Sequence, residues 1–62
     1  MNDYKSNILL VEDEENLHEA LKLNLELEGY EVSSSYDGAQ ALKMISQEHF
    51  DLLILDVMLP EL

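Results

Sequence analysis

Two short apolar runs, each closed by an acid, constrain this chain more than any other feature. Residues 8–11 read Ile-Leu-Leu-Val and lead into Glu12 and Asp13, and residues 52–55 read Leu-Leu-Ile-Leu and lead into Asp56. Four consecutive apolar residues with polar neighbours are typical of a short strand that is buried on both faces. We therefore expect two strands of a parallel sheet, each followed by a carboxylate.

The segment from residue 15 to 28 has the period of a helix. Its apolar residues recur at helical spacing: Leu17, Ala20, Leu21 and Leu25. Gly29 follows as a natural C-terminal stop. Residues 21–27 also alternate between apolar and polar, which is the period of a strand. Because Leu, Lys, Glu and Ala favour helix and no β-branched residue occurs there, a helix is expected.

A weaker strand and a second helix complete the pattern. Asp37 and Gln40 are spaced as a capping box, and we expect Ala41, Leu42 and Ile45 to form the apolar side of the helix that follows. The order strand, helix, strand, helix, strand predicts an α/β fold, a parallel sheet with right-handed crossovers and helices on its faces. The expected strands span about 7–12, 30–35 and 51–56 and the helices about 15–28 and 38–48, within one domain of residues 1–62.

Composition excludes several classes of partner. Fourteen acidic residues against three lysines leave a net charge of −11, so this chain is not expected to bind DNA or RNA directly. Without Cys it can form neither a disulfide nor a thiolate zinc site. No secretory signal and no apolar stretch of about 20 residues is present, which indicates a soluble, cytoplasmic protein without a membrane partner.

The acids that close the two apolar runs are expected to form a metal site. Parallel strands place their carboxyl ends at one edge of the sheet, so Glu12, Asp13 and Asp56 should meet there. Neighbouring strands lie about 4.8 Å apart, within reach of a common ion. Hard oxygen ligands without His or Cys favour Mg²⁺ or Mn²⁺ over zinc. Acids also follow strands where a chain enters solvent, but two runs that end alike favour the metal site.

Three motifs resemble one known family. The stretches "ILLVEDEE", "YDGAQAL" and "LLILDVMLP" resemble, in order and spacing, the receiver domain of two-component response regulators. The resemblance implies a flavodoxin-like (CheY-like) fold and a regulatory phosphoacceptor, not an enzyme. It also implies a sensor histidine kinase as partner and a C-terminal output domain, often a transcription regulator, beyond this chain.

The resemblance also assigns roles to individual residues. Glu12 and Asp13 would hold Mg²⁺, and Asp56 would accept a phosphoryl group from the phosphohistidine of the kinase. The backbone carbonyl of Met58 would be a further metal ligand, and Pro60 would shape the turn that follows. A carboxylate can attack phosphorus in line when a metal neutralises the transferring group. Whether Glu12 coordinates directly or through water stays open, because Glu is longer than Asp.

The chain corresponds to only the N-terminal half of such a receiver. It provides three strands and two helices of a five-stranded fold, without the later strands that carry a Ser or Thr switch hydroxyl and a Lys. It contains no Thr, and none of its lysines ends an expected strand. The third strand, central in the family, would be an exposed apolar edge. We expect one of three situations: the chain pairs through that edge as a homodimer, it is partly disordered, or it is part of a longer receiver. The alternative function is that of a half-receiver that binds metal or self-associates without phosphorylation-dependent switching.

Other interpretations fit less well. A phosphatase of the haloacid dehalogenase type would need a second Asp two residues after Asp56, but that position is occupied by Met58. A dinucleotide-binding fold would need a glycine-rich turn after the first strand, but the stretch "VEDEEN" contains no glycine. His18 and His49 lack companion ligands at metal-binding spacing, so both are expected at the surface or at a helix end.

Overall fold

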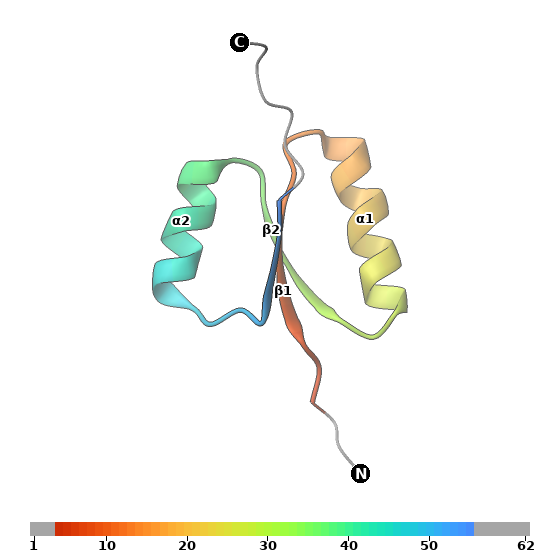
Figure 1. Cartoon of the computed structure of the whole chain (residues 1–62). Coiled ribbons are helices and arrows are strands. Elements are labelled where there is room, and N and C mark those ends of the chain that lie inside the picture. The colour runs from red at the N-terminus through yellow and green to blue at the C-terminus, as the bar shows by residue number, and fades with distance from the viewer. Residues whose placement is uncertain (1–3, 56–62) are drawn as a thin grey trace.

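The computed structural model describes residues 4–55, and these form a three-stranded sheet with two helices. The elements are β1 (Asn7–Val11), α1 (Glu15–Leu27), β2 (Glu31–Ser35), α2 (Gly38–Gln47) and β3 (Leu52–Leu55). The predicted order of strands and helices is therefore confirmed. Figure 1 shows α1 and α2 on opposite sides of the sheet, so the α/β architecture expected from the sequence is confirmed as well.

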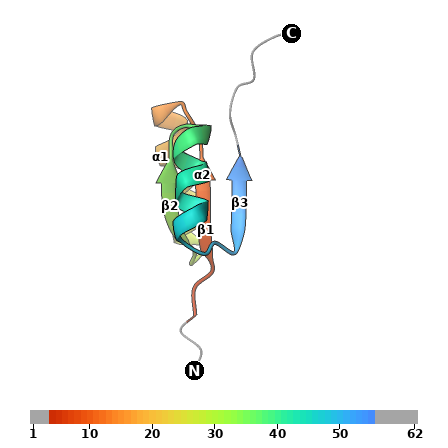
Figure 2. The same cartoon turned by 90° about the vertical axis from the view of Figure 1, so that its left-hand side faces the viewer.

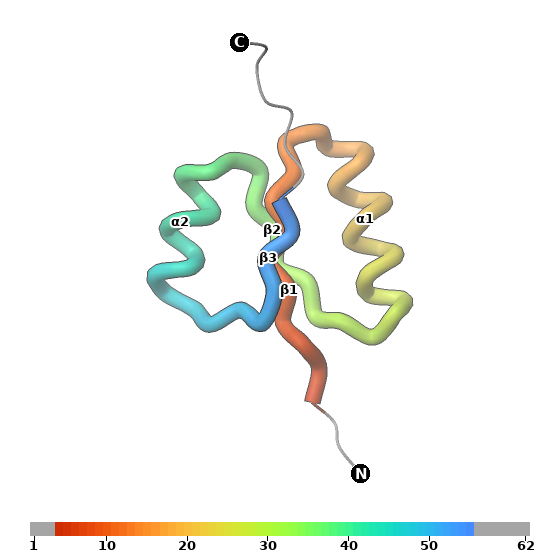
Figure 3. Tube along the Cα trace, in the orientation of Figure 1, coloured from red at the N-terminus to blue at the C-terminus, as the bar shows by residue number. Residues whose placement is uncertain are grey.

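β1 is the central strand of a fully parallel sheet. The strand order is β2-β1-β3, and all three arrows point the same way in Figure 2. Val11, the last residue of β1, is the register partner of both Ser35 and Leu55. The tube in Figure 3 shows how β3 runs alongside β1 after the chain has crossed over through α2. The carboxyl ends of the three strands therefore lie at one edge of the sheet.

The core of the protein is built on β1. Residues 8–11 are at most 1% exposed, which confirms that this strand is buried on both faces. Leu9 and Val11 lie on the face covered by α2, where they form a cluster completed by Ala41, Met44 and Phe50. Strand alternation turns Ile8 and Leu10 toward the opposite, α1, face.

The sequence from Glu15 onward forms a helix, not the alternative strand. Glu14 is its N-cap, and the chain leaves the helix through Gly29, whose φ of +99° suits a residue without Cβ. The predicted apolar stripe is only partly covered, since Leu17 is exposed. Of the two locations predicted for His18, the surface is wrong: the residue lies near the N-terminal end of α1, but at 1% exposure it is the one buried residue of that helix.

α2 begins at the predicted capping box. The Gln40 N–H donates to Asp37 Oδ1 at 2.7 Å, and Gln40 Oε1 accepts the Tyr36 N–H at 3.0 Å. The prediction for Leu42 was wrong, because its side chain is 70% exposed. Met44 takes its place against the sheet, beside the buried Ala41. Helical spacing is compatible with an apolar side made of positions 41, 42 and 45, and equally with one made of positions 41 and 44. Periodicity alone therefore did not determine which side of α2 faces the sheet.

β3 carries the exposed apolar surface that the resemblance implied. Leu52, Leu53 and Leu55 are each about half exposed or more, and within residues 4–55 no strand pairs with the outer edge of β3. Both helices pack on β1 and β2 and leave β3 without helical cover in this part of the chain. None of the described helices has the length and apolar character needed to cross a membrane.

Candidate functional site

The candidate site lies where β1 ends, at the edge of the sheet drawn uppermost in Figure 1. Glu12 directly follows Val11, and its N–H donates to the Ser35 carbonyl at 3.1 Å, which continues the pairing with β2. The structure thus places Glu12 and Asp13 at the predicted edge. The other predicted site residues, Asp56 and Met58, and also Pro60, lie outside the described residues.

Glu12 has a buried carboxylate. The residue is 2% exposed, and its Oε2 accepts the Glu14 N–H at 2.6 Å. Among residues 4–55 no group donates a hydrogen bond to Oε1, and no cationic side chain forms an ion pair with this carboxylate. Oε1 is not among the fully buried polar atoms that lack a partner, so it keeps contact with solvent. A negative oxygen that is accessible and unpaired within residues 4–55 is suited to a cation.

The three acids at positions 12 to 14 have different tasks. Both oxygens of Glu14 are used to cap α1, because they accept the N–H groups of Asn16 at 3.2 Å and Leu17 at 2.7 Å. Asp13 is exposed, and its carboxylate has no hydrogen bond within the described part of the chain. The oxygens free to bind a cation are therefore Glu12 Oε1 and the Asp13 carboxylate.

The donor set fits a hard divalent cation. Two carboxylates at the N-terminal end of a helix, with no thiolate, match the oxygen chemistry of Mg²⁺ or Mn²⁺. Residues 4–55 contain no group of three His, Cys, Asp or Glu side chains arranged to hold a metal ion. The described part thus includes two of the three carboxylates that were predicted, and the third, that of Asp56, lies outside it.

Sequence reasoning did not connect His18 with the candidate site. Its Nδ1 lies 2.9 Å from the Glu12 carbonyl oxygen, and its ring stacks on Tyr36 with centroids 4.3 Å apart. Both partners come from other parts of the chain, one after β1 and one after β2. The available signal was Tyr36, an aromatic residue placed directly after a strand at the same edge as the acids.

A second polar cluster lies at the opposite edge of the sheet, before β3 begins. Asp51 accepts hydrogen bonds from the Asn7 N–H at 2.7 Å and from the Tyr4 hydroxyl, and its Oδ1 lies 3.5 Å from His49 Nε2. The Asn7 amide first, and then the Tyr4 hydroxyl, lower the pKa of Asp51, whereas the bond to Asp51 raises the pKa of Tyr4. The prediction that His49 lies at the surface is confirmed, since its side chain is 87% exposed.

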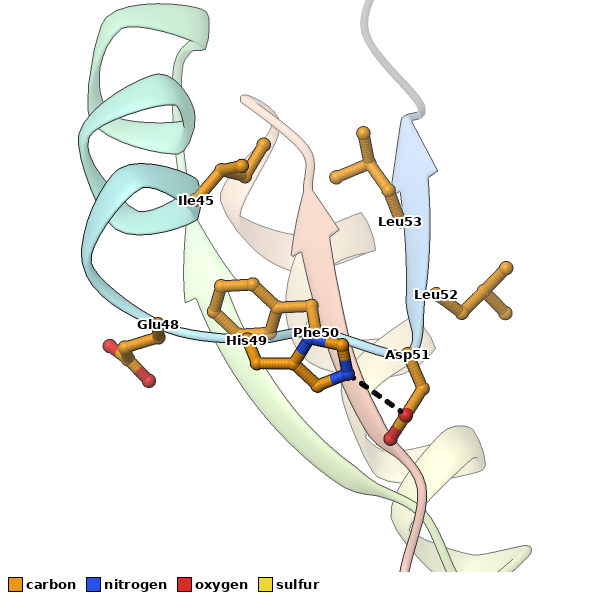
Figure 4. Close-up of a pocket in the computed structure, with 7 residues that line it drawn as sticks. All are labelled: Ile45, Glu48, His49, Phe50, Asp51, Leu52 and Leu53. Atoms are coloured by element: carbon orange, nitrogen blue, oxygen red, sulfur yellow. Dashed lines mark ion pairs between the residues drawn. The ribbon is translucent and has the colours of Figure 1, made fainter.

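The cavity beside this cluster is separate from the candidate site. It has a volume of about 330 Å³ and lies between the end of α2 and β3 (Figure 4). Its lining is Ile45, Glu48, His49, Phe50, Asp51, Leu52 and Leu53. The length of β3, about 13 Å for four residues, separates Asp51 from the edge that holds the acids. This cavity therefore plays no part in the chemistry of the acidic pair.

Comparison with known proteins identifies the family. Residues 8–62 match the model of the response regulator receiver domain, and the chain belongs to that family. It is thus a receiver-domain sequence of the two-component systems, as its three motifs indicated.

Named relatives agree with this assignment. The chain is 51% identical to the alkaline phosphatase synthesis transcriptional regulatory protein PhoP of Bacillus subtilis, over 89% of this chain and 23% of PhoP. It is 46% identical to the response regulator ArlR of Staphylococcus aureus, over 92% of this chain and 26% of ArlR. The chain therefore spans about a quarter of the length of these relatives.

One solved structure has the same fold. The crystal structure of the response regulator TrrA from Thermotoga maritima, in complex with Mg²⁺-BeF, superposes with a TM-score of 0.83 at 44% sequence identity. The match covers 89% of this chain and 48% of that one. The βαβαβ unit described above is accordingly the corresponding part of a CheY-like receiver.

Proposed function

We propose that this chain belongs to a receiver that accepts a phosphoryl group on Asp56 from the phosphohistidine of a sensor histidine kinase. Glu12 and Asp13 would hold Mg²⁺ together with Asp56 and the backbone carbonyl of Met58. The role is regulatory: the phosphorylated state would be the signal, passed to an output domain outside this chain. The kinase and the output domain are inferred from the receiver family and from transcriptional regulators such as PhoP.

The observation that carries the proposal is the buried Glu12 carboxylate with one oxygen free. Oε2 is fixed by the Glu14 N–H, and no donor within residues 4–55 occupies Oε1, so a cation could bind to that oxygen. Register adds support, because Val11 and Leu55 are partners and each is followed in the sequence by an acid, Glu12 and Asp56. Consecutive Cα atoms are about 3.8 Å apart, which limits how far Asp56 can lie from the end of β3.

Each acid would contribute differently to phosphoryl transfer. Asp56 supplies the attacking oxygen and forms the new O–P bond as the bond from phosphorus to the kinase histidine breaks. Glu12 and Asp13 supply the negative oxygens that keep a cation beside it. Bound Mg²⁺ would neutralise charge on the transferring group. Both carboxylate oxygens of Glu14 cap the N-terminal end of α1, so Glu14 would not bind the cation.

Phosphorylation with a small-molecule donor tests the proposal. We expect incubation with acetyl phosphate and Mg²⁺ to add one phosphoryl group by intact mass, and Asp56→Asn or removal of Mg²⁺ to abolish the gain. Glu26→Gln is the control, because Glu26 is an exposed acid near the C-terminal end of α1, away from the candidate site. Phosphorylation that persists in the Asp56 variant would disprove the assignment.

A second candidate is a half-receiver that binds metal or self-associates without phosphorylation-dependent switching. The half-exposed leucines of β3 favour it, since large apolar surfaces promote association. Intact mass and light scattering distinguish the candidates. A dimer that binds Mg²⁺ but never gains a phosphoryl group would support this alternative, and a monomer that gains one would exclude it.

A further inference from the structure

His18 is held between two parts of the candidate site. It lies in the first turns of α1, is 1% exposed, and places Nδ1 at 2.9 Å from the Glu12 carbonyl oxygen. A carbonyl oxygen can only accept a hydrogen bond, so Nδ1 carries the proton in this contact. The other ring nitrogen, Nε2, is buried and has no hydrogen-bond partner among residues 4–55.

The carbonyl that His18 contacts belongs to the peptide bond between Glu12 and Asp13, the two acids of the candidate site. Peptide groups are planar, so a hydrogen bond to the Glu12 carbonyl also fixes the direction of the Asp13 N–H. Glu12 is then held at three points: its N–H by the Ser35 carbonyl, its C=O by His18, and its Oε2 by the Glu14 N–H. Without the contact from His18, this peptide plane could rotate and change how the two carboxylates face each other.

Tyr36 fixes the ring of His18 from the other side. The two rings are stacked, with an angle of 21° between their planes. Tyr36 directly follows Ser35, the residue that accepts the Glu12 N–H. The stacked pair therefore links the loop after β1 to the loop after β2. It fixes the plane of the ring, and the hydrogen bond from Nδ1 to the Glu12 carbonyl selects which edge of the ring faces Glu12.

We propose that His18 is a positioning residue for the acidic pair: through the Glu12 carbonyl it holds Glu12 Oε1 and the Asp13 carboxylate in the arrangement that binds a divalent cation. This inference rests on the metal site of the proposed function. Outer-sphere groups that orient metal ligands typically change affinity by about 10- to 100-fold when removed. His18 would act in that way without touching the ion.

Two substitutions separate the hydrogen bond from the stacking. His18→Phe keeps a ring for Tyr36 and removes the donor to Glu12. His18→Asn keeps a donor close to the place of Nδ1 and removes the ring, and because Nε2 has no partner in the described residues, no other hydrogen bond is lost. Titration calorimetry with magnesium chloride would give the affinity, and urea unfolding without Mg²⁺ would give the stability of each variant.

We expect His18→Phe to weaken Mg²⁺ binding about 10-fold or more and His18→Asn to stay close to the wild type. A purely structural role would lower stability in both variants and leave the affinity of the folded protein unchanged, which would overturn the inference. Equal weakening in both variants would also overturn it, since stacking would then be the cause. If His18→Phe does not fold, His18→Gln replaces it, because its amide reaches toward the position of Nε2 and not Nδ1.

The wild type serves as the test of the underlying site. If it does not bind Mg²⁺ at millimolar concentration, the metal site itself is wrong. If it binds Mg²⁺ and His18→Phe binds equally well, the proposed function stands and only the role of His18 is rejected.

Discussion

The hydroxyl of Tyr4 donates a hydrogen bond to the carboxylate of Asp51, 47 residues further along the chain. The Asn7 N–H donates to the same carboxylate at 2.7 Å, and the Asp51 N–H returns a bond to the Asn7 carbonyl at 2.7 Å. Asp51 therefore ties the segment before β1 to the start of β3. Because these bonds favour the charged carboxylate, its pKa is lowered in the folded state.

This cluster predicts a specific sensitivity to acid. A carboxylate whose pKa is lowered by folding stabilises the protein above its unfolded pKa of about 4, and this contribution is lost as the pH falls through the folded value. We expect Asp51→Asn to be less stable than the wild type at neutral pH and to lose less stability between about pH 5 and pH 3. Urea unfolding across this range would measure both effects. Glu26→Gln, an exposed acid of α1, is the control, and equal acid sensitivity of Asp51→Asn and the wild type would contradict the prediction.

The contribution of Tyr4 to stability should depend on pH in the opposite direction. The bond to Asp51 raises the pKa of Tyr4, so its contribution is complete below about pH 10 and is lost as the pH rises through the folded value. We expect the Tyr4 hydroxyl to give a late ionisation phase, above about pH 10, in an ultraviolet absorbance titration. Tyr4→Phe should remove this late phase, and Asp51→Asn should shift it to lower pH. A late phase that survives in Tyr4→Phe would assign it to another tyrosine.

The core should depend strongly on Leu9. Its side chain is fully buried against Ala41 and Met44, and Leu→Ala changes in such positions cost about 2 to 5 kcal/mol. A chain of 62 residues has about 3 to 9 kcal/mol of stability in total, so Leu9→Ala should be largely unfolded or close to it. Leu42→Ala, at a position 70% exposed, should change stability by only about 0.5 kcal/mol or less. Circular dichroism during urea unfolding would compare them.

Replacing each of the two glycines by alanine should change the stability of the protein in opposite directions. Gly29 has a φ of +99°, and although a Cβ there would meet no atom within 4 Å, the backbone conformation costs a residue with a side chain about 1 to 2 kcal/mol. Gly38 opens α2 and also has free space around a Cβ, so Gly38→Ala should stabilise by about 0.4 to 1 kcal/mol. Thermal unfolding would measure both changes, and a stabilising Gly29→Ala would contradict the assigned turn.

Most of the fold followed from local patterns in the sequence. The apolar run at 8–11 predicted a buried strand because four such residues can be covered only by packing on both faces. Asp37 and Gln40 predicted the start of α2 because the capping box depends on residues three apart, and Gly29 marked the end of α1 for a similar local reason. Signals of this kind are read within a single turn or strand.

The features that the sequence did not predict depend on contacts between distant segments. His18 looked like a polar surface residue, since its burial depends on the Glu12 carbonyl and on Tyr36, 18 positions further along. Leu42 was assigned to the wrong side of α2, because the helix rotation is decided by how Ala41 and Met44 fit Leu9 and Val11. For Asp56, the proposed phosphoacceptor, the sequence motif and the end of β3 remain the basis of the prediction.

The central place of β1 has a consequence for the newly made chain. Of the described strands, β1 is synthesised first, and its second neighbour, β3, follows about 40 residues later, or about 2 to 8 s later at common rates of synthesis. During that interval the Ile-Leu-Leu-Val segment has no complete cover, and an exposed apolar segment of this kind is prone to aggregate. The four acids that follow it immediately, residues 12 to 15, are placed as charged gatekeepers. The two carboxylates proposed to bind metal, those of Glu12 and Asp13, would thus protect the chain from aggregation before there is a sheet edge for them to occupy.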